Sequence, residues 1–302
     1  MQTMLSLAGR NDDPLTATPV RSVLSHLPIM LLLLLACLIP RTACAQELEM
    51  INRPVNSSGL TGLIYTTMPQ TLPVRTFEAG LMMTTENSFK PDYTLTSYPL
   101  TISYGVGRNS EIALRAAYWR TEESDLASSR GFGDTELSYK WNIRPQDERS
   151  AIPGIALFVT GILPTGDRDA GTNVVQHWGM RAGLSAGSEI ELENYILGVY
   201  ADCQVAVQDL SDEQYRDRYQ MLNLGALFPI SKYRNLQLII EYNRMGGRDR
   251  STLHEVDYSA VTYGLRLVKE RFNLTVGTQF MHKHAEGYED SSRISGIISV
   301  KL

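Results

Sequence analysis

Residues 131–143 read GFGDTELSYKWNI, and from residue 134 onward polar and apolar side chains alternate. The polar positions are Asp134, Glu136, Ser138 and Lys140, and the opposite positions are Thr135, Leu137, Tyr139, Trp141 and Ile143. Because successive side chains of a strand point to opposite sides, the stretch predicts a β-strand with one charged face and one apolar, aromatic face. A half-buried strand of a soluble protein shows the same alternation, so the rest of the chain decides between the two settings.

The same two-residue period recurs up to the last residue. The segments that show it are 77–83, 100–104, 112–118, 135–143, 155–162, 178–184, 195–203, 222–228, 236–242, 261–267, 272–280 and 294–302. Segment 155–162 is apolar on both faces, and the others alternate well. No stretch shows a convincing period of 3.6 residues, so the pattern predicts an all-β chain with few helices.

The connections between these segments alternate between long polar stretches and shorter turns. The long ones are 86–93, 121–130, 164–175, 208–218, 244–256 and 282–292. Outer-membrane barrels have long external loops, short periplasmic turns and aromatic girdles at the two membrane interfaces. Aromatic residues such as Trp141 and Phe280 do fall near segment ends on the apolar face. We therefore predict an antiparallel transmembrane β-barrel of about 12 strands, because the alternative, a secreted β-sandwich, gives no reason for such girdles.

A secretory signal precedes the barrel. The apolar run 27–39 is too short for the roughly 20 residues of a membrane-spanning helix. Ala43, Cys44 and Ala45 form a small-x-small cleavage site, so residues 1–45 are predicted to be a signal peptide. Lipid attachment at Cys37 is the weaker alternative, since it would leave a very apolar mature terminus. We expect export through the periplasm to the bacterial outer membrane.

The mature chain is predicted to contain an irregular N-terminal segment, 46–75, and the barrel, 76–302. The segment is punctuated by prolines, and it could close the barrel from inside or lie in the periplasm. Cys203, alone in the mature chain, predicts neither a disulfide nor a zinc site. A net charge of -5 gives no reason to expect nucleic acid. The expected partners are outer-membrane lipid, a small-molecule solute and the barrel assembly machinery.

The face opposite the apolar one carries charges of both signs. We predict that the lumen is lined by Glu78, Arg115, Asp134, Glu136, Lys140, Arg181, Asp202, Glu241, Arg266 and Arg293. Charges inside a barrel are expensive when dry and unpaired, so this face is either a solvated pore lining or a salt-bridged filler. Arg115 is expected to pair with acids on the neighbouring strand. Glycines on the same face favour a lumen with space left; they include Gly80, Gly183, Gly225, Gly264 and Gly277.

The near balance of charge predicts a passive channel with a narrow polar lumen and weak charge selectivity. The alternatives are a structural or adhesive barrel with a filled lumen, and an outer-membrane lipid hydrolase or protease. An enzyme needs a nucleophile beside a positioned base; no serine–histidine pair shares a strand face, while a pair across strands stays open. His282 and His284 lie near acids, but loop histidines beside acids are usually solvated. No metal, cofactor or catalytic residue is predicted.

Three short motifs carry a family resemblance: GFGD at 131–134, SYK at 138–140 and LPTGD at 163–167. In these motifs, and in layout from about residue 80 to residue 302, the chain resembles outer-membrane barrels associated with the meta-pathway of phenol degradation and regarded as transporters. The resemblance implies a barrel and the passage of small organic molecules, and it brings no catalytic residues. Many such barrels end in an aromatic residue, whereas this chain ends in Leu302.

Overall fold

The computed structural model describes residues 53–89, 92–123, 128–146, 152–167, 175, 177–192, 195–210, 217–230, 235–248, 255–284 and 290–302. The predicted signal peptide, residues 1–45, lies outside these ranges. Within them, no helix has the length and apolar character needed to cross a membrane.

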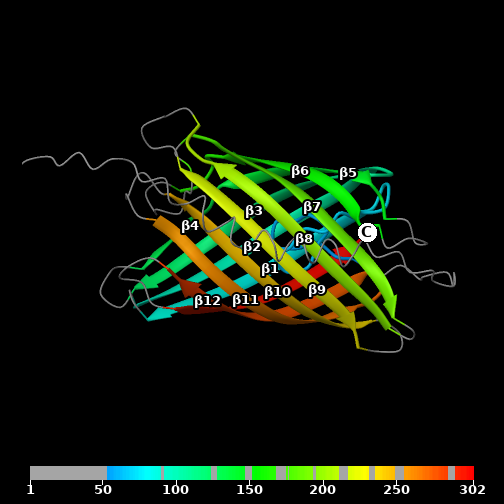
Figure 1. Cartoon of the computed structure of the whole chain (residues 1–302). Helices are drawn as coiled ribbons and strands as arrows, with labels where there is room; N and C mark the ends of the chain where they lie inside the picture. Colours follow the sequence, from blue (N-terminus) through cyan, green and yellow to red (C-terminus); the bar gives the residue numbers. More distant parts are fainter. Residues whose placement is uncertain are drawn as a thin grey trace, which may run out of the picture. The chain divides into compact units, whose positions relative to one another are not determined.

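From residue 77 onward the described chain forms antiparallel strands that close into a barrel (Figure 1). They are β1 (Phe77–Phe89), β2 (Asp92–Gly107), β3 (Ser110–Glu123), β4 (Ser129–Phe132), β5 (Thr135–Arg144), β6 (Gly154–Leu163), β7 (Gly179–Leu192), β8 (Tyr195–Val207), β9 (Arg218–Pro229), β10 (Leu236–Arg248), β11 (Glu255–Val268), β12 (Phe272–Lys283) and β13 (Ser291–Lys301). Pairing of β1 with β13 closes the ring. The short β4 and β5 both pair with β3, so they form one interrupted strand, and the barrel is twelve-stranded as predicted.

The first and last residues of the barrel meet at one end. The main chains of Phe77 and Leu302 exchange hydrogen bonds of 3.3 and 2.9 Å. We call this end the lower rim and the opposite end the upper rim. In Figure 1 the lower rim lies on the side of the C-terminal label.

The predicted apolar face is the exterior of the barrel. Leu81, Leu137, Leu265 and Phe280 are each between 51% and 56% exposed, and they come from strands all around the ring. Such a band of exposed apolar side chains is what contact with lipid tails requires. The segment that is apolar on both faces is β6: Leu157 points outward, whereas Phe158 is buried inside the barrel.

The prediction of a long first loop, 86–93, is wrong. β1 continues to Phe89 and β2 begins at Asp92, so the strands extend through most of that stretch. Glu86 is buried inside the barrel, where its carboxylate accepts a hydrogen bond of 2.9 Å from the Tyr93 hydroxyl. The sequence predicts a loop here because residues 86–93 are mostly polar. The strands continue through most of them without an apolar exterior face.

The sequence motifs 131–134 and 163–167 are joined to each other near the upper rim. Asp134 Oδ1 accepts a hydrogen bond of 2.9 Å from Gly166 N, and Asp167 N donates one of 2.8 Å to the Phe132 carbonyl. At Gly133 the Trp119 ring leaves no room for a Cβ atom, so the break between β4 and β5 needs glycine there. The two motifs therefore form one structural unit.

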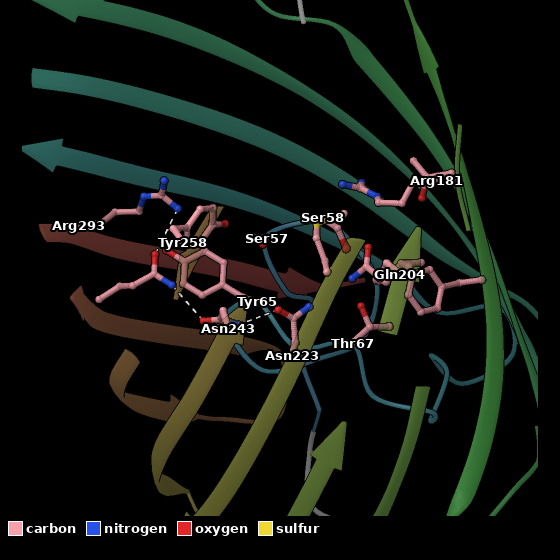
Figure 2. Close-up of a pocket in the computed structure, with 15 residues that line it drawn as sticks. Ser57, Ser58, Tyr65, Thr67, Arg181, Gln204, Asn223, Asn243, Tyr258 and Arg293 are labelled. Carbon is pink, nitrogen blue, oxygen red and sulfur yellow. Dashed lines mark hydrogen bonds between the residues drawn. The ribbon is translucent and has the colours of Figure 1, made fainter. Parts of the chain in front are cut away.

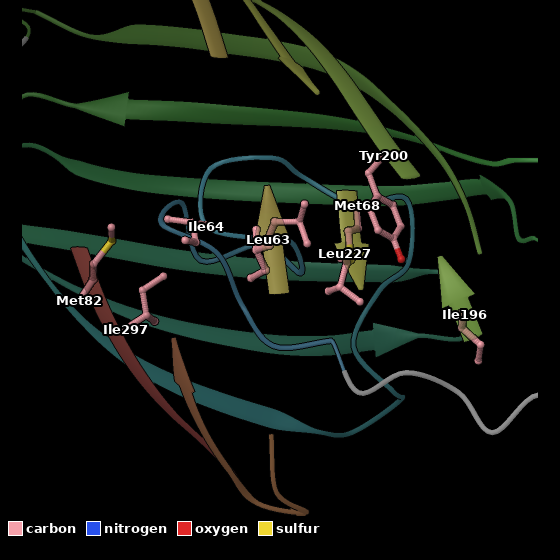
Figure 3. Packing of buried hydrophobic residues seen from close by; sticks show 9 residues of the cluster. Leu63, Ile64, Met68, Met82, Ile196, Tyr200, Leu227 and Ile297 are labelled. Atoms are coloured by element: carbon pink, nitrogen blue, oxygen red, sulfur yellow. The ribbon is translucent and has the colours of Figure 1, made fainter. Parts of the chain in front are cut away.

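The described part of the N-terminal segment lies inside the barrel up to about Leu72. Residues 53–76 form no strand, and isolated bridges join Val55 to Thr61 and Gly62 to Thr67. We call these residues the plug. Figure 3 shows its Leu63, Ile64 and Met68, which are fully buried in a cluster with wall residues Met82, Ile196, Tyr200, Leu227 and Ile297. The plug thus supplies the apolar core of the barrel's interior.

Candidate functional site

Wall carboxylates hold the main chain of the plug. Glu241, on β10, accepts hydrogen bonds of 3.1 Å from Tyr65 N and 2.7 Å from Thr66 N. Asp202, on β8, accepts one of 2.7 Å from Thr67 N. Consecutive amides of a tight plug turn therefore point at two acids of the wall, which is a strong, charge-assisted arrangement.

Glu111 accepts more hydrogen bonds than the other two acids, and it is not among the residues predicted from the sequence to line the lumen. Its carboxylate accepts hydrogen bonds of 2.8 Å from Thr61 N and 2.7 Å from Leu72 N. The strand register sets it opposite Lys140, at 2.8 Å, and both side chains are 0% exposed. Glu111 lies four residues before Arg115 on the same strand face, so extending the alternation towards the preceding turn would have found it.

Wall cations hold the carbonyl groups of the plug. Lys140 Nζ donates to the carbonyls of Thr61 and Met68 at 3.2 and 3.1 Å. Arg266 Nη2 donates to those of Gly62 and Leu63 at 3.1 and 2.8 Å. Buried charges are tolerated when they are hydrogen-bonded in this way, and removal of one partner is costly.

Two further predicted lumen residues also hold the plug. Glu78 Oε1 accepts a hydrogen bond of 3.3 Å from Val55 N, and Arg115 Nε donates one of 3.0 Å to the Ser57 carbonyl. At the start of the plug, Arg53 contacts Glu189 at 2.5 Å, and the Tyr200 hydroxyl donates to the same carboxylate at 2.9 Å. Most of the residues predicted to line the lumen therefore form hydrogen bonds to main-chain groups of the protein.

The inward glycines of the wall make room for packed side chains. A Cβ atom at Gly264 or Gly277 would lie 2.6 Å from Ile64 Cδ1, and one at Gly225 would overlap Leu63 Cδ1. A Cβ atom at Gly80 would lie 3.2 Å from Val55 Cγ2 of the plug, and Gly183 lies under the Phe158 ring. The interpretation of these glycines as a sign of free space is wrong at this level of the lumen.

Above the plug the lumen contains a hollow of about 170 Å³. Its lining joins the plug to most strands of the wall: Ser57, Ser58, Leu60, Tyr65, Thr67, Phe158, Thr160, Arg181, Gln204, Met221, Asn223, Asn243, Tyr258, Gln279 and Arg293. Figure 2 shows Arg181 and Arg293 on opposite sides of it, with Tyr65, Asn223 and Asn243 between them. We call this hollow the upper compartment.

Each of these two arginines belongs to a group of one carboxylate and two cations. Glu136 binds Arg115 at 2.8 Å and Arg181 at 2.6 Å, as the sequence analysis expected for Arg115. Across the compartment, Glu86 binds Arg293 at 2.7 Å and Lys283 at 3.3 Å. The registers set Arg115 directly opposite Glu136 and Glu86 directly opposite Arg293.

A row of neutral side chains connects the walls between these groups. Asn223 Nδ2 donates to Asp202 at 2.9 Å, and Asn243 Nδ2 donates to Asn223 Oδ1 at 2.9 Å. Gln279 Nε2 donates to Asn243 Oδ1 at 3.0 Å, and Arg293 Nη1 donates to Gln279 Oε1 at 3.3 Å. The row runs from β8 to β13 and fixes the amides at the edge of the upper compartment. Asp134 does not take part, because both of its oxygens bind the loop after β6.

The upper-rim histidines form exposed contacts. His282 Nδ1 lies 2.6 Å from Asp290, and His284 Nε2 lies 3.2 Å from Ser259 Oγ and 3.3 Å from Arg244 Nη1. The Ser259–His284 contact is a pair across strands, but an arginine shares the same ring nitrogen, and no described carboxylate is hydrogen-bonded to His284. The described residues contain no group of three or more metal-ligating side chains.

No family model matches the chain, and no curated protein matches its sequence. Among solved structures, it is similar to an outer-membrane channel from Pseudomonas putida F1, with a TM-score of 0.59 and 14% identity over 77% of this chain and 97% of that chain. The NanC porin (TM-score 0.49, 10% identity, 74% and 98% covered) and LpxR from Salmonella typhimurium (TM-score 0.49, 12% identity, 73% and 99% covered) also match. This chain has the fold of an outer-membrane β-barrel.

Proposed function

We propose that the protein is an outer-membrane channel for small organic molecules, and that the plug controls their passage. One observation carries the proposal: the lower lumen is filled by the plug, while the upper compartment is left hollow. A solute that enters from the upper rim reaches that hollow and then meets the plug. Transport therefore requires displacement of the plug. The exposed apolar exterior and the resemblance to barrels of phenol degradation support the membrane location and the solute class.

The contacts between plug and wall suit reversible release. They are hydrogen bonds from side chains such as Glu241 and Arg266 to main-chain groups, and water can replace them. The apolar packing of Leu63 and Ile64 opposes release, because both side chains are 0% exposed when the plug is seated. The balance favours a channel that is closed at rest.

A reversible cross-link between plug and wall tests this proposal. A Cβ atom at Gly80 lies 3.2 Å from Val55 Cγ2, which is within reach of a disulfide. We would make Val55→Cys with Gly80→Cys in a Cys203→Ser background and measure conductance in planar bilayers. Oxidation is expected to abolish stepwise conductance, and reduction to restore it. Each single cysteine variant is the matched control and should not respond to oxidant.

The filled lower lumen also favours a second candidate, a structural barrel without flux. The same experiment separates the two, because a structural barrel gives no conductance in the oxidised or the reduced state. Conductance that is equal in both states would show a path around the plug, and it would remove the plug from the mechanism.

A further inference from the structure

We propose that the upper compartment is a binding site for small organic carboxylates. This inference rests on the proposed channel function and names the class of solute. Of the described side chains that line the compartment, the two charged ones are Arg181 and Arg293, and they face it from opposite walls (Figure 2).

The arginines remain attractive to an anion although each has a carboxylate partner. Glu136 is shared by Arg115 and Arg181, and Glu86 is shared by Arg293 and Lys283. Among the described residues, the Glu136 group therefore carries a formal excess of one positive charge. In a compartment with protein walls, such an excess acts over a longer range than in bulk water.

A third acid, Asp202, lies at the β8 end of the amide row and is not among the described residues that line the compartment. Asp202 is 2% exposed, and its oxygens accept hydrogen bonds from Gln204, Asn223 and the main chain of Thr67. Those donors stand between its charge and the compartment. The prediction of weak selectivity rested on near-equal numbers of acidic and basic residues over the whole barrel. That count does not describe the upper compartment, because the acids of the lower lumen hold the plug.

The rest of the lining suits an organic ion rather than a bare inorganic one. Tyr65, Tyr258 and Phe158 offer ring surfaces, and the amides of Asn243 and Gln279 offer hydrogen bonds. The volume, about 170 Å³, corresponds to on the order of ten water molecules, which is enough for a single-ring carboxylate.

Binding of benzoate and benzamide to the purified protein in detergent tests the inference. The two molecules share a ring and differ in charge, so calorimetric titration isolates the carboxylate. We expect benzoate to bind with an affinity at least tenfold above that of benzamide. Arg181→Gln and Arg293→Gln should each weaken benzoate binding about tenfold, as loss of a charged hydrogen bond implies. Arg271→Gln, at an exposed turn of the lower rim, should leave binding unchanged.

Both arginine variants keep one cation on each carboxylate, Arg115 on Glu136 and Lys283 on Glu86. A second approach leaves the ion pairs intact: Met221→Glu adds a negative charge to the lining and should abolish benzoate binding, whereas Met221→Gln should not. Equal binding of benzoate and benzamide, or unchanged binding in both arginine variants and in Met221→Glu, would overturn the inference.

Failure of this inference is distinguishable from failure of the channel proposal. Binding is measured on the protein in detergent and needs no passage through the plug. Conductance that responds to the Val55–Gly80 cross-link, together with no preference for benzoate, would leave a channel without this site. Selective benzoate binding with no conductance would leave a binding barrel without flux.

Discussion

Arg266 Nη2 donates a hydrogen bond of 2.8 Å to the carbonyl of Leu63, although the two residues are 203 positions apart in the chain. A cation of β11 thus fixes the main chain of the plug just where the Leu63 side chain packs into the wall. The same guanidinium binds Thr275 of the next strand at 3.0 Å, so it is held from the wall side as well.

Replacement of Arg266 by methionine should loosen the plug without preventing barrel closure. The variant removes two charge-assisted hydrogen bonds to plug carbonyls, which we expect to weaken docking by about 3 kcal/mol. The readouts are conductance in planar bilayers and tryptic cleavage after Arg75, and both should rise. Arg271→Met, at an exposed turn, is the control and should behave as wild type. If Arg266→Met shows neither increase, this contact does not hold the plug.

Replacement of Gly225 by valine should expel Leu63 from its place in the wall. A side chain there overlaps Leu63 Cδ1, so the free energy of plug docking should become less favourable by about 1–3 kcal/mol. The additional substitution Leu63→Ala makes room for the valine side chain of the Gly225→Val variant, so conductance of the double variant should fall back towards the wild-type value. Gly296→Val is the matched control, since nothing lies within 4 Å of a Cβ atom at that position. A Gly225→Val protein that conducts like wild type would contradict tight packing at this contact.

Replacement of Asp134 by asparagine should free the loop after β6. Its two oxygens accept hydrogen bonds of 2.9 Å from Gly166 N and 2.8 Å from Val175 N, and an amide offers one acceptor in place of two. We expect faster tryptic cleavage after Arg168, with an unchanged circular dichroism spectrum. Glu270→Gln, at an exposed turn of the lower rim, should leave the cleavage rate as it is. Equal cleavage rates in Asp134→Asn and wild type would mean that Asp134 does not secure this loop.

Substitutions in the Glu136 group should change ion selectivity in opposite directions. Glu136→Gln removes the one negative charge and leaves Arg115 and Arg181, so anion permeability should rise relative to cation permeability. Arg115→Gln removes a positive charge and should shift the reversal potential the other way under the same salt gradient. It also releases the Ser57 carbonyl, so its total conductance should increase. Shifts of the same sign in both variants would contradict control of selectivity by this group.

The strand pattern could be predicted from sequence because it rests on a local rule. Leu137 and Lys140 reveal their faces through neighbours a few residues away, and the exterior side chains are exposed as expected. The position of the plug could not be predicted in this way. Residues 53–76 have no period, and several of their partners, such as Glu241 and Arg266, lie more than a hundred positions away. The inward glycines were ambiguous for the same reason, since an empty space and a filled one require the same small residue.

The order in which the segments are synthesised differs from the order in which they can reach their folded positions. The plug is the earliest of the described segments to be synthesised, yet Tyr65 binds Ser295 in the final strand, at 2.8 Å between the two hydroxyl oxygens. Its remaining partners are spread over strands that have no fixed relation to one another until the ring is nearly complete. Until the plug is seated, water has to satisfy Lys140 and Arg266 in place of the plug carbonyls. Seating of the plug is therefore expected to be a late step of assembly, which must wait until the last strand is in place.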